Sequence, residues 1–154
     1  MTALELDELV RRFDACELSR PEWTHEAHLS VGLWHVCRYG PEPALARLRI
    51  GIRRLNESNG VVNSATSGYH ETITCAYVQL LARFAARSAD LPVGEGLAQL
   101  LAGGLADRRA LLKFYSRARL ESTDARLGWV EPDVAPLALD RVLERSAAHE
   151  VPYQ

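Results

Sequence analysis

The sequence predicts an all-α fold, and three observations lead to that prediction. Apolar residues recur every three to four positions along most of the 154-residue chain, which is the period of an amphipathic helix. Residues that favour helix starts and helix ends separate these segments, and no segment alternates apolar and polar residues as a half-buried strand would. We therefore expect one compact helical domain over residues 1–154, a bundle of about six helices with one long irregular loop.

The first two helices are predicted from their caps. Thr2 and Glu5 have the spacing of a capping box, and an amphipathic apolar face follows them. Thr24 is a favourable N-cap for the second helix, which we expect to end near Tyr39, where a glycine follows.

The third and fourth helices are separated by the long loop. The third is expected to begin at Pro43, because proline is favoured in the first turn, and to run to about Asn56. Turn-forming residues fill positions 56–68, and a loop of this length inside a small domain is often functional. A fourth helix is predicted from His70 to about Arg87.

The rest of the chain is predicted to be helical in shorter segments. Residues 92–101 and 107–115 have helical apolar spacing on either side of a Gly-Gly break. Ser122 is expected to cap a short turn through Arg126, and residues 138–148 are expected to form the last helix.

Charge and composition narrow the classes of function. The net charge of −2 gives no electrostatic reason to expect nucleic acid or an anionic membrane as a partner. No apolar run reaches the roughly 20 residues that span a bilayer, and the N-terminus has no signal-peptide pattern. The three cysteines are scattered and fit free thiols in a reducing compartment. We therefore expect a cytoplasmic protein with a small-molecule substrate, and the sequence leaves open whether it forms a homodimer.

Three histidines are the strongest functional signal. His25 and His28 lie three residues apart, so both imidazoles lie on one helix face, which neighbouring leucines predict to be buried. His70 begins another helix and would bring a third imidazole toward the same space. Three protein ligands with an open position are typical of a catalytic metal, and helix bundles build such sites from facing helices. We therefore predict that these histidines bind a divalent transition metal, zinc or iron, with Glu71 as fourth ligand or general base.

Two other interpretations of the histidines stay open. In one they are metal-free acid–base groups, and in the other they are structural residues whose ring nitrogens are hydrogen-bonded. His35 lies two turns beyond His28, too far to join the same ion, and the structural interpretation suits it better.

A second candidate group surrounds Tyr115. Its hydroxyl can stabilise an oxyanion, and an inward arginine can clamp a carboxylate or phosphate with two hydrogen bonds. We expect Arg117, Arg119 or Arg126 to turn toward the pocket beside Tyr115, with Arg126 favoured because of its place in a packed turn. Tyr115 is thus predicted to be catalytic and Arg117 and Arg126 to bind substrate. Because arginine is common on protein surfaces, a solvent-facing position is the alternative for each of them.

The loop before His70 is the third candidate, since it would form the wall or lid of any site built there. Asn63 and Tyr69 are expected to contact the substrate. The alternative for Asn63 is a turn former with no other role.

Several motifs give the chain a family resemblance. It contains W-T-H-x-x-H-L at residues 23–29, G-Y-H-E-T at residues 68–72 and Y-S-R-x-x-L-x-S-x-x-A-R at residues 115–126. With these motifs it resembles, over nearly its whole length, a widespread bacterial family of small helical proteins. That family has no established activity, so the resemblance implies no particular reaction. It does imply one shared pattern of site residues, namely His25, His28, His70, Glu71, Tyr115 and Arg126.

Taken together, the candidate residues predict a metal-dependent enzyme that acts on a small anionic metabolite. Hydrolysis or a lyase-type step is expected, in which a metal-bound water attacks or a substrate oxygen is polarised. A non-haem iron or copper oxygenase is the alternative enzyme class, because two histidines and a carboxylate also suit Fe(II). The non-enzymatic alternative is a module that binds a small ligand or a metal without turnover.

Overall fold

The computed structural model describes residues 1–143, and within them it contains helices and loops but no strand, which confirms the all-α class. Its long helices are α1 (Ala3–Asp14), α2 (His25–Tyr39), α3 (Pro41–Ser58), α4 (Glu71–Arg87) and α5 (Val93–Ala102). Short elements follow them, namely η1 (Gly104–Ala106), η2 (Ala110–Lys113), α6 (Arg117–Leu120), α7 (Thr123–Leu127) and α8 (Asp140–Leu143).

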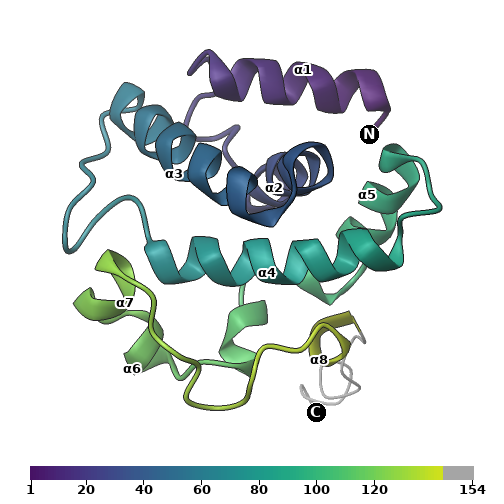
Figure 1. The fold of residues 1–154 in the computed structure, drawn as a ribbon. Helices are drawn as coiled ribbons and strands as arrows, with labels where there is room; N and C mark the ends of the chain where they lie inside the picture. The colour runs from purple at the N-terminus through teal and green to yellow at the C-terminus, as the bar shows by residue number, and fades with distance from the viewer. Residues whose placement is uncertain (144–154) are drawn as a thin grey trace, which may run out of the picture.

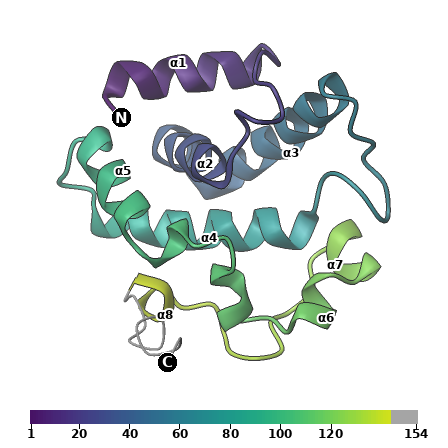
Figure 2. The same cartoon turned by 180° about the vertical axis from the view of Figure 1, so that it is seen from behind.

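Helix α4 runs across the middle of the molecule. Figures 1 and 2 show α1, α2 and α3 on one side of it and α6, α7 and α8 on the other. Helix α2 is the most enclosed helix, because α1, α3, α4 and α5 all pack against it. Fully buried side chains such as Leu29, Leu33 and Leu81 fill the α2–α4 contact and form the centre of the core. The first turns of α2 and α4 are thereby held at fixed positions.

The predicted caps of the first two helices are present. The Thr2 hydroxyl accepts a hydrogen bond from the Glu5 backbone N–H, and the Glu5 carboxylate accepts one from the Thr2 N–H, which completes the capping box. Thr24 caps α2 through the Ala27 backbone N–H. Helix α3 begins two residues earlier than predicted because Gly40, with φ of +81°, turns the chain directly from α2 into α3.

The segment after α5 differs from the prediction. Residues 107–115 form no α-helix but a short 3-10 turn, η2. The Asp107 carboxylate accepts a hydrogen bond from the backbone N–H of Arg109, a local turn that competes with helix formation. Helix α6 was not predicted and begins at the Ser116 cap, whereas Ser122 caps α7 as expected. Of the helix predicted over residues 138–148, α8 covers the first part, and residues 144–148 lie outside the described chain.

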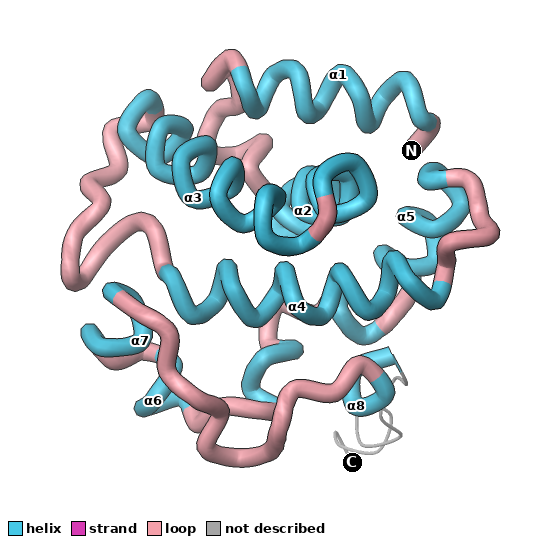
Figure 3. Tube along the Cα trace, viewed as in Figure 1, coloured by secondary structure: helices cyan, strands magenta, loops and turns pink. Residues whose placement is uncertain are grey.

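The long loop is irregular, as predicted, and is held by its own hydrogen bonds (Figure 3). The Asn63 side-chain oxygen accepts hydrogen bonds from the Tyr69 backbone N–H and the Asn56 amide, while its amide donates to the Arg53 carbonyl. Gly68 has φ of +77°, and a Cβ there would lie 2.5 Å from the Asn63 oxygen. These contacts fold the loop around the Asn63 side chain and fix the direction in which the chain enters α4.

Among the described residues, no helix combines the length and the apolar character that a bilayer requires.

Candidate functional site

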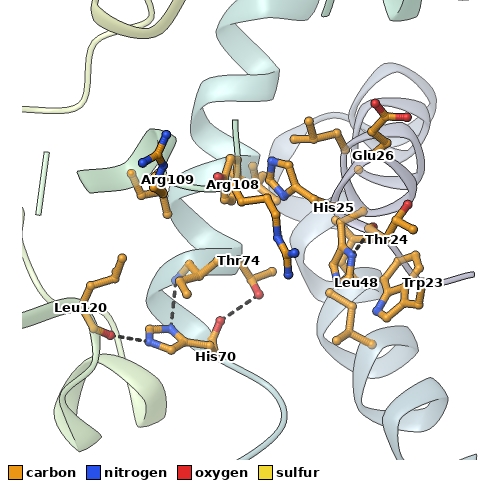
Figure 4. A pocket seen from close by; sticks show the side chains of 18 of the residues that line it. Trp23, Thr24, His25, Glu26, Leu48, His70, Thr74, Arg108, Arg109 and Leu120 are labelled. Carbon is orange, nitrogen blue, oxygen red and sulfur yellow. Dashed lines mark hydrogen bonds between the residues drawn. The ribbon is translucent and has the colours of Figure 1, made fainter. Parts of the chain in front are cut away.

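A cavity of about 950 Å³ lies between the start of α2, the first half of α4 and the segment from Ala106 to Arg126 (Figure 4). This volume is near the upper end of the range for small-molecule pockets. Its lining contains His25, His28 and His70, so all three predicted histidines border one space. The charged lining residues are Arg20, Glu26, Arg108, Arg109, Arg117, Glu121 and Arg126.

His28 lies in the first turn of α2, facing the cavity. Its Nδ1–H donates to the Thr24 carbonyl at 2.7 Å, so in the neutral ring Nε2 carries the lone pair. The imidazole packs on Trp23 with ring centroids 3.8 Å apart. His28 is exposed at the cavity surface, but the protein atoms crowded around its imidazole disfavour the charged form and lower its pKa to about 4. The Thr24 carbonyl opposes this effect, and the charges of His25 and Arg108 add to it. His28 is therefore a neutral hydrogen-bond acceptor at physiological pH.

His25 opens α2 and points toward the C-terminal half of the chain. Its Nε2–H donates to the Leu105 carbonyl at 2.9 Å, and its ring meets the edge of Tyr77 at 5.5 Å. Among described residues Nδ1 has no hydrogen-bond partner. One ring nitrogen of His25 is thus hydrogen-bonded to the protein backbone, and the other has no partner among the described residues.

His70 has neither nitrogen available. It is the N-cap of α4, and its Nδ1 accepts from the Ile73 backbone N–H at 3.1 Å. Its Nε2–H donates to the Leu120 carbonyl at 2.7 Å, which ties α4 to α6 (Figure 4). Burial lowers the pKa of this imidazole, and the Arg126 charge adds to the effect although the Leu120 carbonyl opposes it. The predicted role as metal ligand would require one of these two hydrogen bonds to break.

The predicted three-histidine metal centre does not fit this geometry. Each imidazole donates to a different backbone carbonyl, and the described residues include no group of three His, Cys, Asp or Glu side chains arranged to hold an ion. The histidines share a cavity without converging on one point. His35, interpreted as structural, is buried and donates Nδ1–H to the Val31 carbonyl at 2.8 Å.

The arginines around the cavity differ in their partners. Arg109 pairs with Asp107, Arg117 pairs with Glu121, and Arg126 donates to the Gly68 carbonyl at 2.7 Å. Arg20 and Arg108 have no ion pair or hydrogen bond from their side chains to any residue that the structure describes. In Figure 4 the Arg108 side chain extends into the space between His70 and Trp23. Two cationic groups therefore face the cavity with unused hydrogen-bond donors.

The predicted arginine clamp is only partly supported. Arg117 and Arg126 do line the cavity, but both have protein partners, and Arg119 donates to the Glu131 carbonyl instead. Tyr115 does not line the cavity at all. It is fully buried, and its hydroxyl donates to the Val130 carbonyl at 2.8 Å. Tyr115 is therefore not placed for the catalytic role expected of it in this cavity. Burial of its phenol raises its pKa to about 12, which suits a structural tyrosine.

Three further candidates lie on the other side of the start of α4. Glu71 accepts three hydrogen bonds from the Arg49 guanidinium, the shortest at 2.6 Å, and one from the Tyr69 hydroxyl at 2.6 Å. Burial favours protonation of Glu71, but these hydrogen bonds outweigh it and its pKa is lowered. The cavity lining does not include Glu71, Tyr69 or Asn63. Glu71 is thus not placed as a base or metal ligand there, and Asn63 and Tyr69 stabilise the loop rather than contact a ligand in this cavity.

Three cavity residues were not predicted from the sequence, namely Arg20, Arg108 and Trp23. The apolar spacing predicts a regular helix around Arg108. Its position between a Gly-Gly break and an apolar run could instead have indicated an irregular turn. The Trp23 indole stacks on Phe13 as well as on His28, and its N–H is buried without a hydrogen-bond partner among the described residues. Unmatched buried donors are rare in native proteins, and this one belongs to a residue of the cavity lining.

Comparisons of the chain with protein-family models, with curated proteins and with solved structures found no match.

Proposed function

We propose that the cavity binds a small anionic metabolite and that the protein transforms it by acid–base chemistry through His28 and His25. One observation carries the proposal: Arg108 and His28 line the same cavity, and the Arg108 side chain extends into it with no hydrogen-bond or ion-pair partner among the described residues. A guanidinium binds carboxylates and phosphates through paired hydrogen bonds. An anion held by Arg108 would therefore lie beside a neutral imidazole.

The two histidines differ in what they offer a bound molecule. Nε2 of His28 carries a lone pair that accepts a hydrogen bond from a substrate group or a bound water. The negative charge of an anion bound beside it would raise the pKa of His28 toward the range in which a general base works. Nδ1 of His25, three residues earlier on the same helix face, is the second ring nitrogen without a partner among the described residues. Such a pair suits a lyase-type or hydrolytic step, in which one group removes a proton and another returns it.

Other residues act by holding the cavity wall in place. His70 ties α4 to the Leu120 carbonyl, and Arg126 ties α7 to the Gly68 carbonyl. The Thr72 hydroxyl adds a third link by donating to the Gly128 carbonyl at 2.8 Å. These contacts keep the C-terminal wall at a fixed distance from α2, which preorganises the site.

Binding is tested by titrating the protein with acetate, inorganic phosphate, citrate and octanoate while NMR follows the histidine ring signals. At least one of these anions should shift the His28 signals saturably, and Arg108→Ala should weaken its binding about tenfold, the effect of losing a charge-assisted hydrogen bond. Arg54→Ala is the matched control, because Arg54 is exposed on α3 and does not line the cavity. Equal affinities in both variants, or no saturable shift with any anion, would refute the proposal.

Chemistry is tested separately from binding. Incorporation of solvent deuterium into a bound carboxylate, followed by NMR, should be lost in His28→Ala while the variant still binds the anion. Binding without exchange in the parent protein would support the non-catalytic module instead.

A metal-dependent hydrolase, lyase or oxygenase is the second candidate. It is favoured by the two open nitrogens, His28 Nε2 and His25 Nδ1, which lie on residues three apart in one helix. Elemental analysis of the purified protein and of His28→Ala tests it. Stoichiometric zinc or iron that His28→Ala loses would favour this candidate, and metal content unaffected by the substitution would count against it.

A further inference from the structure

The cavity has two chemically different parts. Six of its seven charged residues are exposed and form a mouth with an excess of positive charge: four arginines, Arg20, Arg108, Arg109 and Arg117, and two glutamates, Glu26 and Glu121. Its apolar residues are deeper: Leu29, Leu48, Val78 and Leu81 are between 1% and 4% exposed. The cationic donors therefore lie at the entrance and the apolar surface lies at the floor.

The floor is made by close packing of α2 against α4. A Cβ on Gly32 would lie 2.8 Å from the Leu81 Cδ1 atom, so glycine lets the two helices approach at this point. Ile52 of α3 and Ile73 of α4 extend the apolar lining from this contact toward the mouth. The floor residues are already packed against one another, so the apolar surface open to the cavity comes from the partly buried Ile52, Ile73 and Tyr77. A small polar anion held at the mouth would leave this surface in contact with water, at a cost proportional to its area.

The side wall also favours an apolar occupant. The Trp23 and His28 rings present aromatic surface between the mouth and the floor, and the lowered pKa of His28 keeps that imidazole uncharged. The wall thus adds hydrogen-bonding capacity without adding charge. A ligand that matches the whole cavity has one anionic group followed by an apolar body.

We infer that the ligand of this cavity is an amphipathic monoanion, an alkyl or acyl chain of several carbons ending in a carboxylate or phosphate. Its head binds Arg108, with Arg20 beside the entrance, and its chain lies against the partly buried Ile52, Ile73 and Tyr77. The inference rests on the proposed anion-binding function and specifies the class of anion.

A homologous series tests this inference. Calorimetric titration with acetate, butyrate, hexanoate and octanoate, below micelle-forming concentrations, should show affinity rising about fourfold for each added methylene, the gain expected from burying that group. Octyl phosphate alongside octanoate distinguishes the two head groups. Anion binding with no dependence on chain length would overturn the inference and leave the proposed function standing, whereas no binding of any anion would remove both.

Two matched substitutions on α3 test where the alkyl chain of the ligand lies. Ile52→Thr puts a hydroxyl into the cavity lining, and Ile50→Thr makes the same change at a side chain that is 61% exposed and outside the cavity. Ile52→Thr should weaken octanoate binding several-fold while acetate binding stays unchanged, and Ile50→Thr should change neither. Equal effects of the two variants would contradict the placement of the alkyl chain.

Arg108→Ala should weaken every member of the series by the same factor and leave octanol binding unaffected, because it removes only the contact with the charged head.

Discussion

Two polar regions meet at the first turn of α4, and they differ in how completely their hydrogen-bonding groups are matched. On the side of α3, Glu71 is paired with Arg49 and Tyr69, and Asn63 uses both its oxygen and its amide. On the side of α2, Arg108 has no described partner for its side chain, and His25 and His28 each keep one unbonded ring nitrogen. The first region is closed and the second is open to a ligand.

This difference shows which property separates structural from functional polar residues. Both regions contain the residue types that serve in catalysis, and the G-Y-H-E-T segment contributes to each of them through Glu71 and His70. Residue type therefore does not distinguish them. The decisive property is whether the donors and acceptors are already satisfied within the protein, because a satisfied group gains little from binding a ligand.

The largest effect is expected in the closed region. Glu71→Ala leaves the Arg49 guanidinium and the Tyr69 hydroxyl without their common acceptor, which should reduce the free energy of unfolding by about 3 kcal/mol. Urea denaturation measures this change. Glu57→Ala, an exposed glutamate on α3, is the control and should alter stability by less than about 0.5 kcal/mol. A Glu71 variant as stable as the control would mean that the network does not hold the fold.

His70 provides a test at the boundary of the two regions. His70→Ala removes the cap of α4 and the link to Leu120, and should cost about 2 kcal/mol. His70→Asn should recover about half of this, because asparagine caps helices well but is too short for the Leu120 contact. Thermal or urea unfolding of both variants measures the effect. If His70→Ala were as stable as the parent, His70 would be free to act as a ligand or base after all.

Tyr115 is expected to contribute a smaller, purely structural effect. Tyr115→Phe removes one hydrogen bond to the Val130 carbonyl and should lower the free energy of unfolding by about 1 kcal/mol. Anion affinity in the NMR titration should be unchanged. A loss of affinity at unchanged stability would restore the tyrosine to the functional site.

The last effect concerns pH, and we expect it to be small because the His28 residue is exposed to solvent. The pKa values of His28 and His70 are lower in the folded protein than the ordinary value of 6.5, mainly because burial disfavours their charged forms. Between the folded and the unfolded pKa the unfolded chain binds more protons, so the stability that these histidines contribute is full above pH 6.5 and declines as the pH falls below it. Urea denaturation at pH 7 and pH 5 should show a smaller decline for His28→Asn than for the parent protein. Identical pH dependence would indicate that His28 is not desolvated.

The sequence by itself determined the helices and where most of them begin. Capping is local chemistry, since a hydroxyl at Thr2, Thr24 or Ser122 reaches a backbone N–H three residues away whatever the rest of the chain does. The sequence also identified His25, His28 and His70 as residues around one cavity, because their helical faces and the neighbouring apolar residues predicted an interior position.

Only the tertiary structure decided which polar residues were left available. Leu105, Leu120 and Val130 supply carbonyls to His25, His70 and Tyr115 from 15 to 80 positions away along the chain, and no local pattern reveals those pairings. Arg108 likewise became a cavity residue because the segment after the Gly-Gly break folds as an irregular turn against α2. Hydrogen bonds between distant segments depend on the packing of the whole fold, and they determine which candidate groups remain free to meet a ligand.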